Sequence, residues 1–476
     1  QTKIDEAWVY SIGSENVVVA VIDSGVSLTH ADLKDNIWIN KDEIPDNQKD
    51  DDGNGYIDDV HGWNFVEDNN DPNPVFENFT TEGVSHGTLV AGMIAARGHN
   101  NEGIAGVAWT AKIMAVRTLN SLGEGTIEDA VEAIRYAADN GASVINFSFV
   151  GILSTPLFQD AVEYAYKKGV VLVAAVGNDA IGTFPSFSGG NLDEQPIYPA
   201  CFKSARDDLV IGVGAVDKDN VKTSFSNFGH TCIDINAPGV DIVSTQVGHP
   251  TRGVPFNAEY SGLWNGTSFA APQVSGVAAL IKALNPGYNN KEIISLILDT
   301  GDSLDTANPK LIGQLGRGLL NARRALKAAA PATFVTRDPR EVLYLERANR
   351  ALWVAANIEE NAKTNDVLKI DITFKNKGEI PWEIGQLSLH LTDANDGPID
   401  IVPNRLPYDK QENVLASQVM HLEGLVKAPG NPGLHTVKLQ LFYKDLPVKG
   451  ATFFKTITIT TPAAAKLESH TLPIAV

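Results

Sequence analysis

Residues 16–25 read NVVVAVIDSG, a run of small and branched apolar residues that ends close to Asp23. Apolar side chains at nearly every position are typical of a strand that is buried on both faces, as in the parallel sheets of α/β proteins. We therefore expect a strand over 16–22 with Asp23 at its carboxyl end, the edge where ligands and catalytic groups gather in open α/β sheets. Four further runs of the same kind lie at 112–118, 143–148, 170–176 and 209–216.

Segments with a helical repeat separate these runs. They lie at 86–96, 126–140 and 156–168, and a longer stretch rich in Ala and Val spans 268–284. Short apolar strands that alternate with helices favour a parallel sheet with helices on both faces. The sequence therefore predicts a doubly wound, mostly parallel α/β domain.

The pattern changes after Ala330, where Pro331 and Pro339 mark a boundary. From Val367 onward apolar and polar residues alternate with a period of two, which is typical of half-buried strands. These stretches lie at 368–374, 386–391, 436–443 and 452–460. We expect a smaller all-β sandwich of Ig-like size. The predicted boundaries are 1–330 for the α/β domain, 331–345 for a linker and 346–476 for the sandwich.

Composition and charge exclude some functions. The chain has 476 residues, of which 58 are acidic and 38 are basic, and its formal net charge is −20. A field of that sign repels nucleic acids and anionic membranes. No apolar run approaches the roughly 20 residues that cross a bilayer. We expect neither a nucleic-acid partner nor a membrane span.

The chain begins at Gln1 with neither a basic nor an apolar leader. This start indicates a processed product from which a signal peptide or pro-segment has been removed. Two cysteines are present, Cys201 and Cys232. They could form one bridge in an oxidising compartment or remain as two buried thiols, and both interpretations stay open here.

Four short motifs place one Asp, one His, one Asn and one Ser at predicted strand ends or helix starts. They are VIDSG at 21–25, SHGTLVAG at 85–92, AAVGN at 174–178 and NGTSFAAP at 265–272. We expect His86 at the N-terminus of its helix and Ser268 as the first residue of the long helix. Asn-X-Ser/Thr triplets at Asn146 and Asn265 fall on the same segments, and we interpret them as chance rather than as glycosylation sites.

These four residue types belong together chemically. A serine hydroxyl is a poor nucleophile until a base such as imidazole takes its proton. A carboxylate fixes the tautomer of the imidazole and stabilises its charged form. An amide side chain can donate a hydrogen bond to the oxyanion that develops during acyl transfer. A serine at a helix start adds its own backbone N–H and the positive end of the helix dipole.

In the order Asp, His, Asn, Ser, the motifs resemble those of the subtilisin-like serine proteases, the subtilase family, from about Lys3 to Leu326. The resemblance implies a secreted, extracellular or cell-surface serine endopeptidase that forms an acyl-enzyme on Ser268 and hydrolyses protein and peptide substrates. It also implies a zymogen whose cleaved propeptide acts as inhibitor and chaperone. The implied catalytic residues are Asp23, His86 and Ser268, with Asn178 in the oxyanion hole.

Three other functions are possible for a chain with motifs of this kind. A sedolisin-like protein would carry Glu in place of His86 and Asp in place of Asn178, and neither is found. A catalytically silent binding or scaffold protein of the same fold would usually have lost one of the four residues. An acyl transferase or peptide cyclase, in which an amine outcompetes water, is a further alternative.

The same resemblance implies where a peptide substrate binds. Two segments should pair with its main chain, and glycines there let the backbones approach closely. Val150 stands where many relatives have Gly, so we hypothesise a narrowed primary pocket; Ile127 and Phe149 should line an apolar pocket further out. The implied substrate-binding residues are Gly123, Glu124, Gly125, Ile127, Ser148, Phe149, Val150, Gly151, Ala175, Val176 and Gly177.

Residues 50–59 read DDDGNGYIDD, which follows the start of an EF-hand-type calcium loop. Oxygens of Asp50, Asp52 and Asn54 and the carbonyl of Tyr56 fit that pattern. His61 stands at the twelfth position, so Asp58 or Asp59 would supply the closing carboxylate. We expect Ca²⁺ as the cofactor, with a solvated acidic loop as the alternative. No His/Cys cluster has the ligand spacing of a zinc site.

The resemblance implies two more calcium segments. Residues 67–71, with Asp68 and Asp71, match one of them. Asp32 matches a ligand of the family's high-affinity site, whose partner loop would be 100–104. Some relatives also carry a disulfide in the region of Cys201 and Cys232.

Overall fold

The structure is a computed structural model of the whole chain. It divides into two compact units, Gln1–Pro339 and Arg340–Val476, which are described separately. The described residues are 1–332 except 101, 179–188, 205–208 and 250; 334, 336 and 338; and 351–460 except 359–360, 378–381, 384–385, 394–404, 408–413, 416, 429–430 and 445. Most of the predicted linker, 331–345, lies outside them.

The first unit is built on a seven-stranded sheet in the order β2-β3-β1-β4-β5-β6-β7, in which every neighbouring pair is parallel. The predicted α/β fold class is therefore confirmed, and the strand that carries Asp23 lies inside the sheet between β3 and β4. The strands are β1 (Val18–Asp23), β2 (Gly62–Asn64), β3 (Lys112–Arg117), β4 (Val144–Phe147), β5 (Val171–Ala175), β6 (Ile211–Val216) and β7 (Ile235–Pro238).

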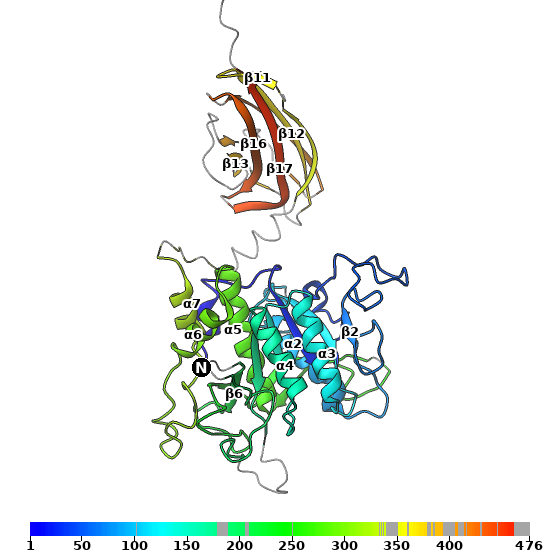
Figure 1. Ribbon diagram of the computed structural model, residues 1–476, viewed down its shortest axis with the longest axis vertical. Coiled ribbons are helices and arrows are strands. Elements are labelled where there is room, and N and C mark those ends of the chain that lie inside the picture. Colours follow the sequence, from blue (N-terminus) through cyan, green and yellow to red (C-terminus); the bar gives the residue numbers. More distant parts are fainter. Residues whose placement is uncertain are drawn as a thin grey trace, which may run out of the picture. The chain divides into compact units, whose positions relative to one another are not determined.

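Helices cover both faces of this sheet (Figure 1). One face packs against α1 (Ile4–Ala7), α2 (Thr81–Ala95), α5 (Ala271–Leu284), α6 (Asn290–Leu298) and α7 (Ala322–Ala329). The other face packs against α3 (Ile127–Asp139) and α4 (Pro156–Lys167). The strands read as apolar throughout because alternate side chains enter the two cores, for example Val19 and Val21 on one side and Ala20 and Ile22 on the other.

Two predicted helix starts are wrong. Helix α2 begins at Thr81, because the Thr80 side chain caps it by accepting a hydrogen bond from the Gly83 N–H at 2.9 Å. His86 therefore lies in the second turn rather than at the N-terminus. Ser268 does not begin the long helix either: it lies in the 3₁₀ turn η2 (Thr267–Phe269), and α5 starts at Ala271 with Pro272 in its first turn.

Two smaller features complete the first unit. A second 3₁₀ turn, η1, spans Lys34–Asn36, and an antiparallel hairpin of β8 (Ile242–Thr245) and β9 (Tyr260–Trp264) precedes η2. A disulfide joins Cys201 to Cys232, which decides between the two interpretations left open by the sequence. Among the helices of the described residues, none has the length and apolar character needed to cross a membrane.

The second unit is a β structure of two main sheets. One has the order β10-β12-β15 and the other the order β11-β17-β16-β13-β14. Apolar residues of both sheets form one buried core, in which Trp382 is fully enclosed. The strands are β10 (Ala351–Ile358), β11 (Asn361–Lys363), β12 (Val367–Asn376), β13 (Leu387–Asp393), β14 (Arg405–Pro407), β15 (Val419–Lys427), β16 (Gly433–Tyr443) and β17 (Leu446–Thr460). The predicted β-rich region is confirmed, and four of its strands were predicted.

Candidate active site

Asp23 and His86 form a buried pair at the carboxyl end of β1. The Nδ1 atom of His86 lies 2.8 Å and 2.9 Å from the two carboxylate oxygens of Asp23. The same carboxylate accepts a hydrogen bond of 2.7 Å from the Ser24 backbone N–H. Asp23 is fully buried, and His86 is 9% exposed. Since Nδ1 faces the carboxylate, the proton-accepting Nε2 is left available for a reacting group.

A glycine allows this approach of helix to strand. At Gly87, a Cβ atom would lie 2.3 Å from the Gly25 carbonyl oxygen and 3.1 Å from the Asp23 Cβ. Any larger residue would therefore push α2 away from β1. The Gly87 N–H also bonds to Ser24 Oγ at 3.2 Å. The His-Gly pair of the motif thus has a steric reason: the residue after His86 must have no side chain.

The Asp23 carboxylate shifts the protonation of His86. Burial disfavours the imidazolium form, but the charge of Asp23 and its hydrogen bond outweigh this effect, so the pKa of His86 is raised above its ordinary value. A base that binds its proton more firmly accepts one more readily from a hydroxyl group. The pair therefore has the electrostatics of a general base held by a carboxylate.

Ser268 is the middle residue of η2, and it is half-buried between the buried Thr267 and Phe269. Its hydroxyl donates a 2.9 Å hydrogen bond to the Ser148 carbonyl oxygen, and the Ser148 hydroxyl donates back to the Ser268 carbonyl oxygen at 2.9 Å. Within the described residues, no hydrogen bond joins Ser268 to His86. The next residue, Phe269, packs its ring 5.7 Å from the His86 ring. The serine and the imidazole are thus held on neighbouring segments.

Asn178 is oriented by the residue before Ser268. Its Oδ1 atom accepts hydrogen bonds from the Thr267 backbone N–H at 2.8 Å and from the Thr267 hydroxyl at 3.0 Å. With the oxygen engaged twice, the Nδ2 group is the part of the amide that can donate elsewhere. The structure therefore brings Asn178 to the nucleophile turn, and within the described residues its Nδ2 group makes no hydrogen bond.

The predicted peptide-binding segments meet at one cavity of about 260 Å³. It lies between the segment Gly123–Gly125 and the segment Phe149–Gly151, and Ile127 and Phe149 both line it. Main-chain hydrogen bonds of 2.8 Å in both directions pair Gly151 with Tyr198, which fixes one of these segments. The structure thus places the predicted outer apolar pocket and both predicted ribbons in one cleft.

The predicted wall of the primary pocket follows β5, where Ala175 and Val176 are buried. Gly177 has a φ of 84°, a conformation that side chains rarely adopt. A Cβ atom at Gly177 would lie 2.9 Å from Ile197 Cδ1 and 3.5 Å from Val150 Cγ1. Two branched side chains therefore converge on this wall. Ile197 was missed from the sequence, because nothing in its local pattern relates it to Gly177, twenty residues earlier.

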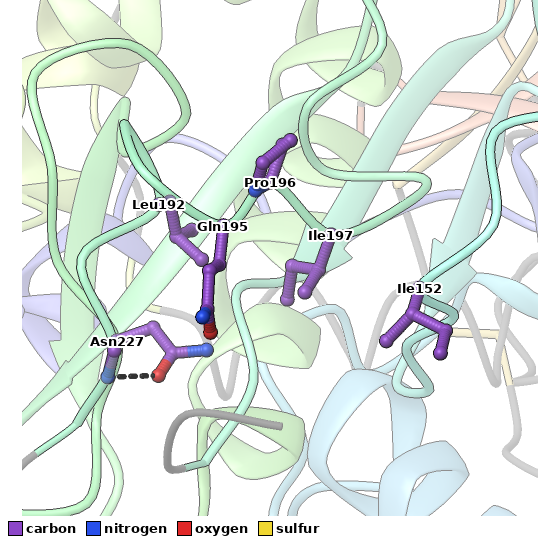
Figure 2. Close-up of a pocket in the computed structure, with 7 residues that line it drawn as sticks. Ile152, Leu192, Gln195, Pro196, Ile197 and Asn227 are labelled. Atoms are coloured by element: carbon purple, nitrogen blue, oxygen red, sulfur yellow. Dashed lines mark hydrogen bonds between the residues drawn. The ribbon is translucent and has the colours of Figure 1, made fainter. Parts of the chain in front are cut away.

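Ile197 also borders a second cavity, of about 250 Å³, shown in Figure 2. Ile152 and Asn227 lie on opposite sides of this view. Asn227 is tied down at both ends of its amide, since Nδ2 donates to the Val176 carbonyl at 2.8 Å and Oδ1 accepts from the Gly190 N–H at 2.6 Å. The cavity is lined by Ile152, Gly190, Leu192, Gln195, Pro196, Ile197 and Asn227.

Three carboxylates converge at the 50–59 loop, two of them from the loop itself. Glu43, Asp52 and Asp59 each bring an oxygen within 4.8 Å of the others. Glu43 is 5% exposed, and its Oε2 atom has no hydrogen-bond partner among the described residues. Burial raises the pKa of Glu43 and of Asp59. Sequence reasoning missed Glu43, although it is the only Glu between Glu15 and the 50–59 loop.

The other loop residues make internal contacts. Asp50 accepts hydrogen bonds from the Asn54 and Gly55 N–H groups at 3.0 and 2.9 Å, and the Gly55 bond contributes most to a lowered pKa of Asp50. Asn54 donates to Asp59 at 3.1 Å. The Tyr56 ring packs against Tyr136, and burial raises the pKa of Tyr56 to about 12. Asp58 instead accepts from the Asn47 and Gln48 N–H groups at 3.1 and 2.8 Å.

The remaining predicted metal residues are not members of the three-carboxylate cluster. In the segment 67–71, Glu67 forms an ion pair with the buried Arg117, and Asp71 accepts from the Asn73 side chain at 2.7 Å. Asp68 is exposed. Asp32 accepts from Asn100 Nδ2 at 2.6 Å and from the Ile104 N–H at 3.0 Å. The partner loop therefore does meet Asp32, although its residue 101 lies outside the described part of the chain.

A buried Asp–His pair beside a serine turn, at the carboxyl edge of a parallel sheet enclosed by helices, defines a serine hydrolase of the open α/β type. Comparison with known proteins makes this more specific: the model of the subtilase family (peptidase S8) matches residues 14–318, and the chain belongs to this family. It is accordingly a serine endopeptidase that acts on peptide substrates.

Several known proteins are similar to about two thirds of the chain. The chain is 39% identical to the thermophilic serine proteinase of Bacillus sp. (strain AK1) over 303 residues, which are 64% of this chain and 61% of that protein. It is 34% identical to thermitase of Thermoactinomyces vulgaris over 322 residues, which cover 68% and 92% of the two chains. A solved protease structure from Pseudoalteromonas arctica PAMC 21717 superimposes with a TM-score of 0.53 at 30% identity, covering 69% and 94%.

Proposed function

We propose that the protein is a secreted, calcium-stabilised endopeptidase in which Ser268 is the nucleophile, His86 the general base, Asp23 the orienting carboxylate and Asn178 an oxyanion donor. The proposed division is a catalytic domain over 1–330, a linker over 331–345 and a β-sandwich over 346–476. The contact division between Pro339 and Arg340 supports it.

The observation that carries the proposal is the orientation of the two polar side chains around Ser268. His86 turns Nδ1 to Asp23 at 2.8 Å, and Asn178 turns its oxygen to Thr267 at 2.8 Å. Each side chain therefore keeps the atom that the reaction needs: Nε2 to accept a proton and Nδ2 to donate to an oxyanion.

The reaction then has two stages. Ser268 Oγ attacks the peptide carbonyl carbon while His86 takes the hydroxyl proton, and His86 passes that proton to the leaving amine as the peptide C–N bond breaks. Water then attacks the acyl-enzyme, with His86 again accepting a proton and returning it to Ser268. Asn178 and the Ser268 backbone N–H stabilise the oxyanion in both stages.

The substrate is proposed to bind as an extended peptide between two segments. Gly123, Glu124 and Gly125 form one of them, and Ser148 to Gly151 form the other. Main-chain pairing of this kind accepts many sequences, so the pockets set the preference. Val150 and Ile197 both lie against Gly177, which supports a primary pocket that favours medium-sized over large aromatic side chains.

The acidic cluster fits a calcium ion. Calcium takes six to eight oxygen ligands, and carboxylates are prominent among them. Glu43, Asp52 and Asp59 would hold the ion, which would offset two of the three negative charges and bind the unsatisfied oxygen of Glu43. We propose this cluster as the main stabilising site and regard Asp32, Asp68 and Asp71 as candidates for further sites.

The proposal of secretion is supported by the disulfide. Disulfides persist in oxidising compartments, and one joins Cys201 to Cys232. The resemblance to subtilases also implies a cleaved propeptide that acts as inhibitor and chaperone.

Hydrolysis by the protein and by Ser268→Ala, each with calcium and with a chelator, tests the proposal. The variant should lose roughly 10⁶-fold in kcat, the loss known for the corresponding triad substitution in subtilisin. Product masses separate hydrolysis, which adds water, from transpeptidation. If the folded wild-type protein cleaves no substrate, the result contradicts the proposal and favours a catalytically silent binding or scaffold protein.

A further inference from the structure

A row of buried polar side chains runs from helix α5 to the backbone of the nucleophile. Ser275 Oγ donates to Asn146 Oδ1 at 2.8 Å, and Asn146 Nδ2 donates to Ser148 Oγ at 2.9 Å. Ser148 Oγ donates in turn to the carbonyl oxygen of Ser268 at 2.9 Å. Ser275 and Asn146 are fully buried, and Ser148 is 4% exposed.

The row lies where apolar residues would be the simpler choice. Asn146 is in the centre of the sheet on β4, and its neighbour Phe147 packs into the apolar core on the other face. A buried polar group costs free energy unless its hydrogen bonds are made, and here each of the three side chains has a partner. In the triplet Asn146-Phe147-Ser148, the first and third residues therefore hydrogen-bond to each other on the side of the sheet opposite Phe147. Because Asn146 is fully buried, this triplet is not a glycosylation site.

The ends of the row identify what it holds in place. Ser148 begins the segment proposed to bind the substrate, and Ser268 is the proposed nucleophile. The two residues also exchange hydrogen bonds, because Ser268 Oγ donates to the Ser148 carbonyl at 2.9 Å. The peptide plane after Ser268 is thus fixed to the substrate-binding segment by the Ser148 hydroxyl. Asn146 and Ser275 in turn hold that hydroxyl in place.

We propose that Asn146 and Ser148 are positioning residues for the nucleophile. This inference rests on the proposed function of Ser268. By holding the Ser268 carbonyl, they set the position of Oγ and of the Ser268 N–H relative to His86 and the bound peptide. Misplacement of a reacting group by about 1 Å can cost about 100-fold in rate, so a small relaxation of this plane affects the chemical step far more than substrate affinity.

The test compares Ser148→Ala with Ser244→Ala. Ser244 is also fully buried, and its hydroxyl also donates to a backbone carbonyl, that of Leu89 at 2.7 Å, but it is not part of the row. We expect kcat on a peptide substrate to fall roughly 10- to 100-fold in Ser148→Ala with KM within about twofold. The rate of covalent inactivation by a small sulfonyl fluoride should fall by a similar factor. Ser244→Ala should lose comparable thermal stability while its kcat is retained.

Further variants separate the possible failures. Ser148→Thr, which keeps the hydroxyl, should recover most of kcat. If Ser148→Ala does not fold, Ser275→Ala removes the far end of the row and should lower kcat roughly threefold at constant KM. Wild-type kcat in folded Ser148→Ala, or in Ser275→Ala, overturns the inference. If Ser268→Ala keeps full activity, the proposed function has failed instead.

Discussion

The catalytic cluster and the carboxylate cluster of the same unit differ in what completes them. Around Asp23, His86 and Asn178, the orienting hydrogen bonds come from the chain itself, at 2.7–3.0 Å. Around Glu43, Asp52 and Asp59, three carboxylates lie together and a buried oxygen of Glu43 has no partner among the described residues. The first cluster is organised by hydrogen bonds within the chain, whereas the second leaves one buried carboxylate oxygen that the proposed calcium ion would satisfy.

In the acidic segment 67–71, by contrast, a basic side chain of the protein itself pairs with a carboxylate. Glu67 pairs with Arg117, which is 1% exposed in its side chain, while the Glu67 side chain is 43% exposed. Both segments look like calcium sites from sequence, because both are short and rich in Asp, Asn and Glu. In the structure the two segments differ, because only 67–71 has the guanidinium group of Arg117 beside it. Activity, calcium dependence and the Glu67–Arg117 ion pair can therefore be tested independently.

After Ser268→Ala, the largest effect is expected from Asp23→Asn. Without the carboxylate, the imidazole is no longer held in the tautomer with Nε2 as the acceptor, and kcat should fall by about 10⁴-fold, as in other triads. Because the cluster is complete without metal, the loss should be the same at every calcium concentration. Kinetics at micromolar and millimolar calcium check this. Activity restored by calcium would contradict the division between the clusters.

Removal of calcium should have the next largest effect, on stability rather than on the chemical step. A ligand present at about 1,000 times its Kd stabilises the folded state by about 4 kcal/mol. For a unit of this size, chelation should lower Tm by roughly 6 °C, with kcat retained below the new transition. Calorimetry with and without chelator measures the shift.

The matched variant for this second prediction is Glu43→Gln. It replaces a buried carboxylate of raised pKa by a neutral group of the same shape. The variant should lose most of the calcium-dependent increment, yet be no less stable than the wild type in chelator, since one repelling charge is gone. A full calcium increment in Glu43→Gln would remove Glu43 from the site.

Acid should reduce activity by about tenfold per pH unit below the raised pKa of His86, because only the neutral imidazole accepts a proton. The sign for stability is opposite. A raised folded-state pKa stabilises the fold fully below the unfolded value of about 6.5, and this contribution disappears as pH rises through the folded value. Mild acid should therefore inactivate the enzyme while the stabilising contribution of the Asp23–His86 pair is kept. A pH–rate profile with circular dichroism at each pH separates the two, and simultaneous loss of both signals would refute the assignment.

The sequence predicted the parts of the structure that depend on local pattern. Runs such as 16–22 are apolar on both faces, and this indicated a parallel sheet with Asp23 at its edge. The family motifs located His86 and Ser268, but the helix starts were wrong. Gly83 and Gly87 weaken the helical pattern around the true start at Thr81, and η2 is a turn that no periodicity distinguishes from α5.

Contacts between distant segments could not be predicted in this way. Ile197 reaches Gly177, Glu43 joins Asp52 and Asp59, and Arg117 pairs with Glu67 across 50 residues. Each depends on how loops return to the sheet edge rather than on local composition. The same limit explains why the segment 67–71 was predicted as a calcium segment before the position of Arg117 was known.

The smallest expected effect is that of Glu67→Gln, which sharpens the comparison between the acidic segments. An ion pair with one exposed partner contributes little, so the direct loss should be about 1 kcal/mol, part of it from Arg117 left without its carboxylate. The calcium-dependent increment should be unchanged, in contrast to Glu43→Gln, because the cation near Glu67 is the guanidinium of Arg117. Unfolding in urea at two calcium concentrations measures both quantities. If Glu67→Gln removed the increment as well, calcium rather than Arg117 would be the main partner of Glu67, and the two segments would be parts of one metal-dependent region.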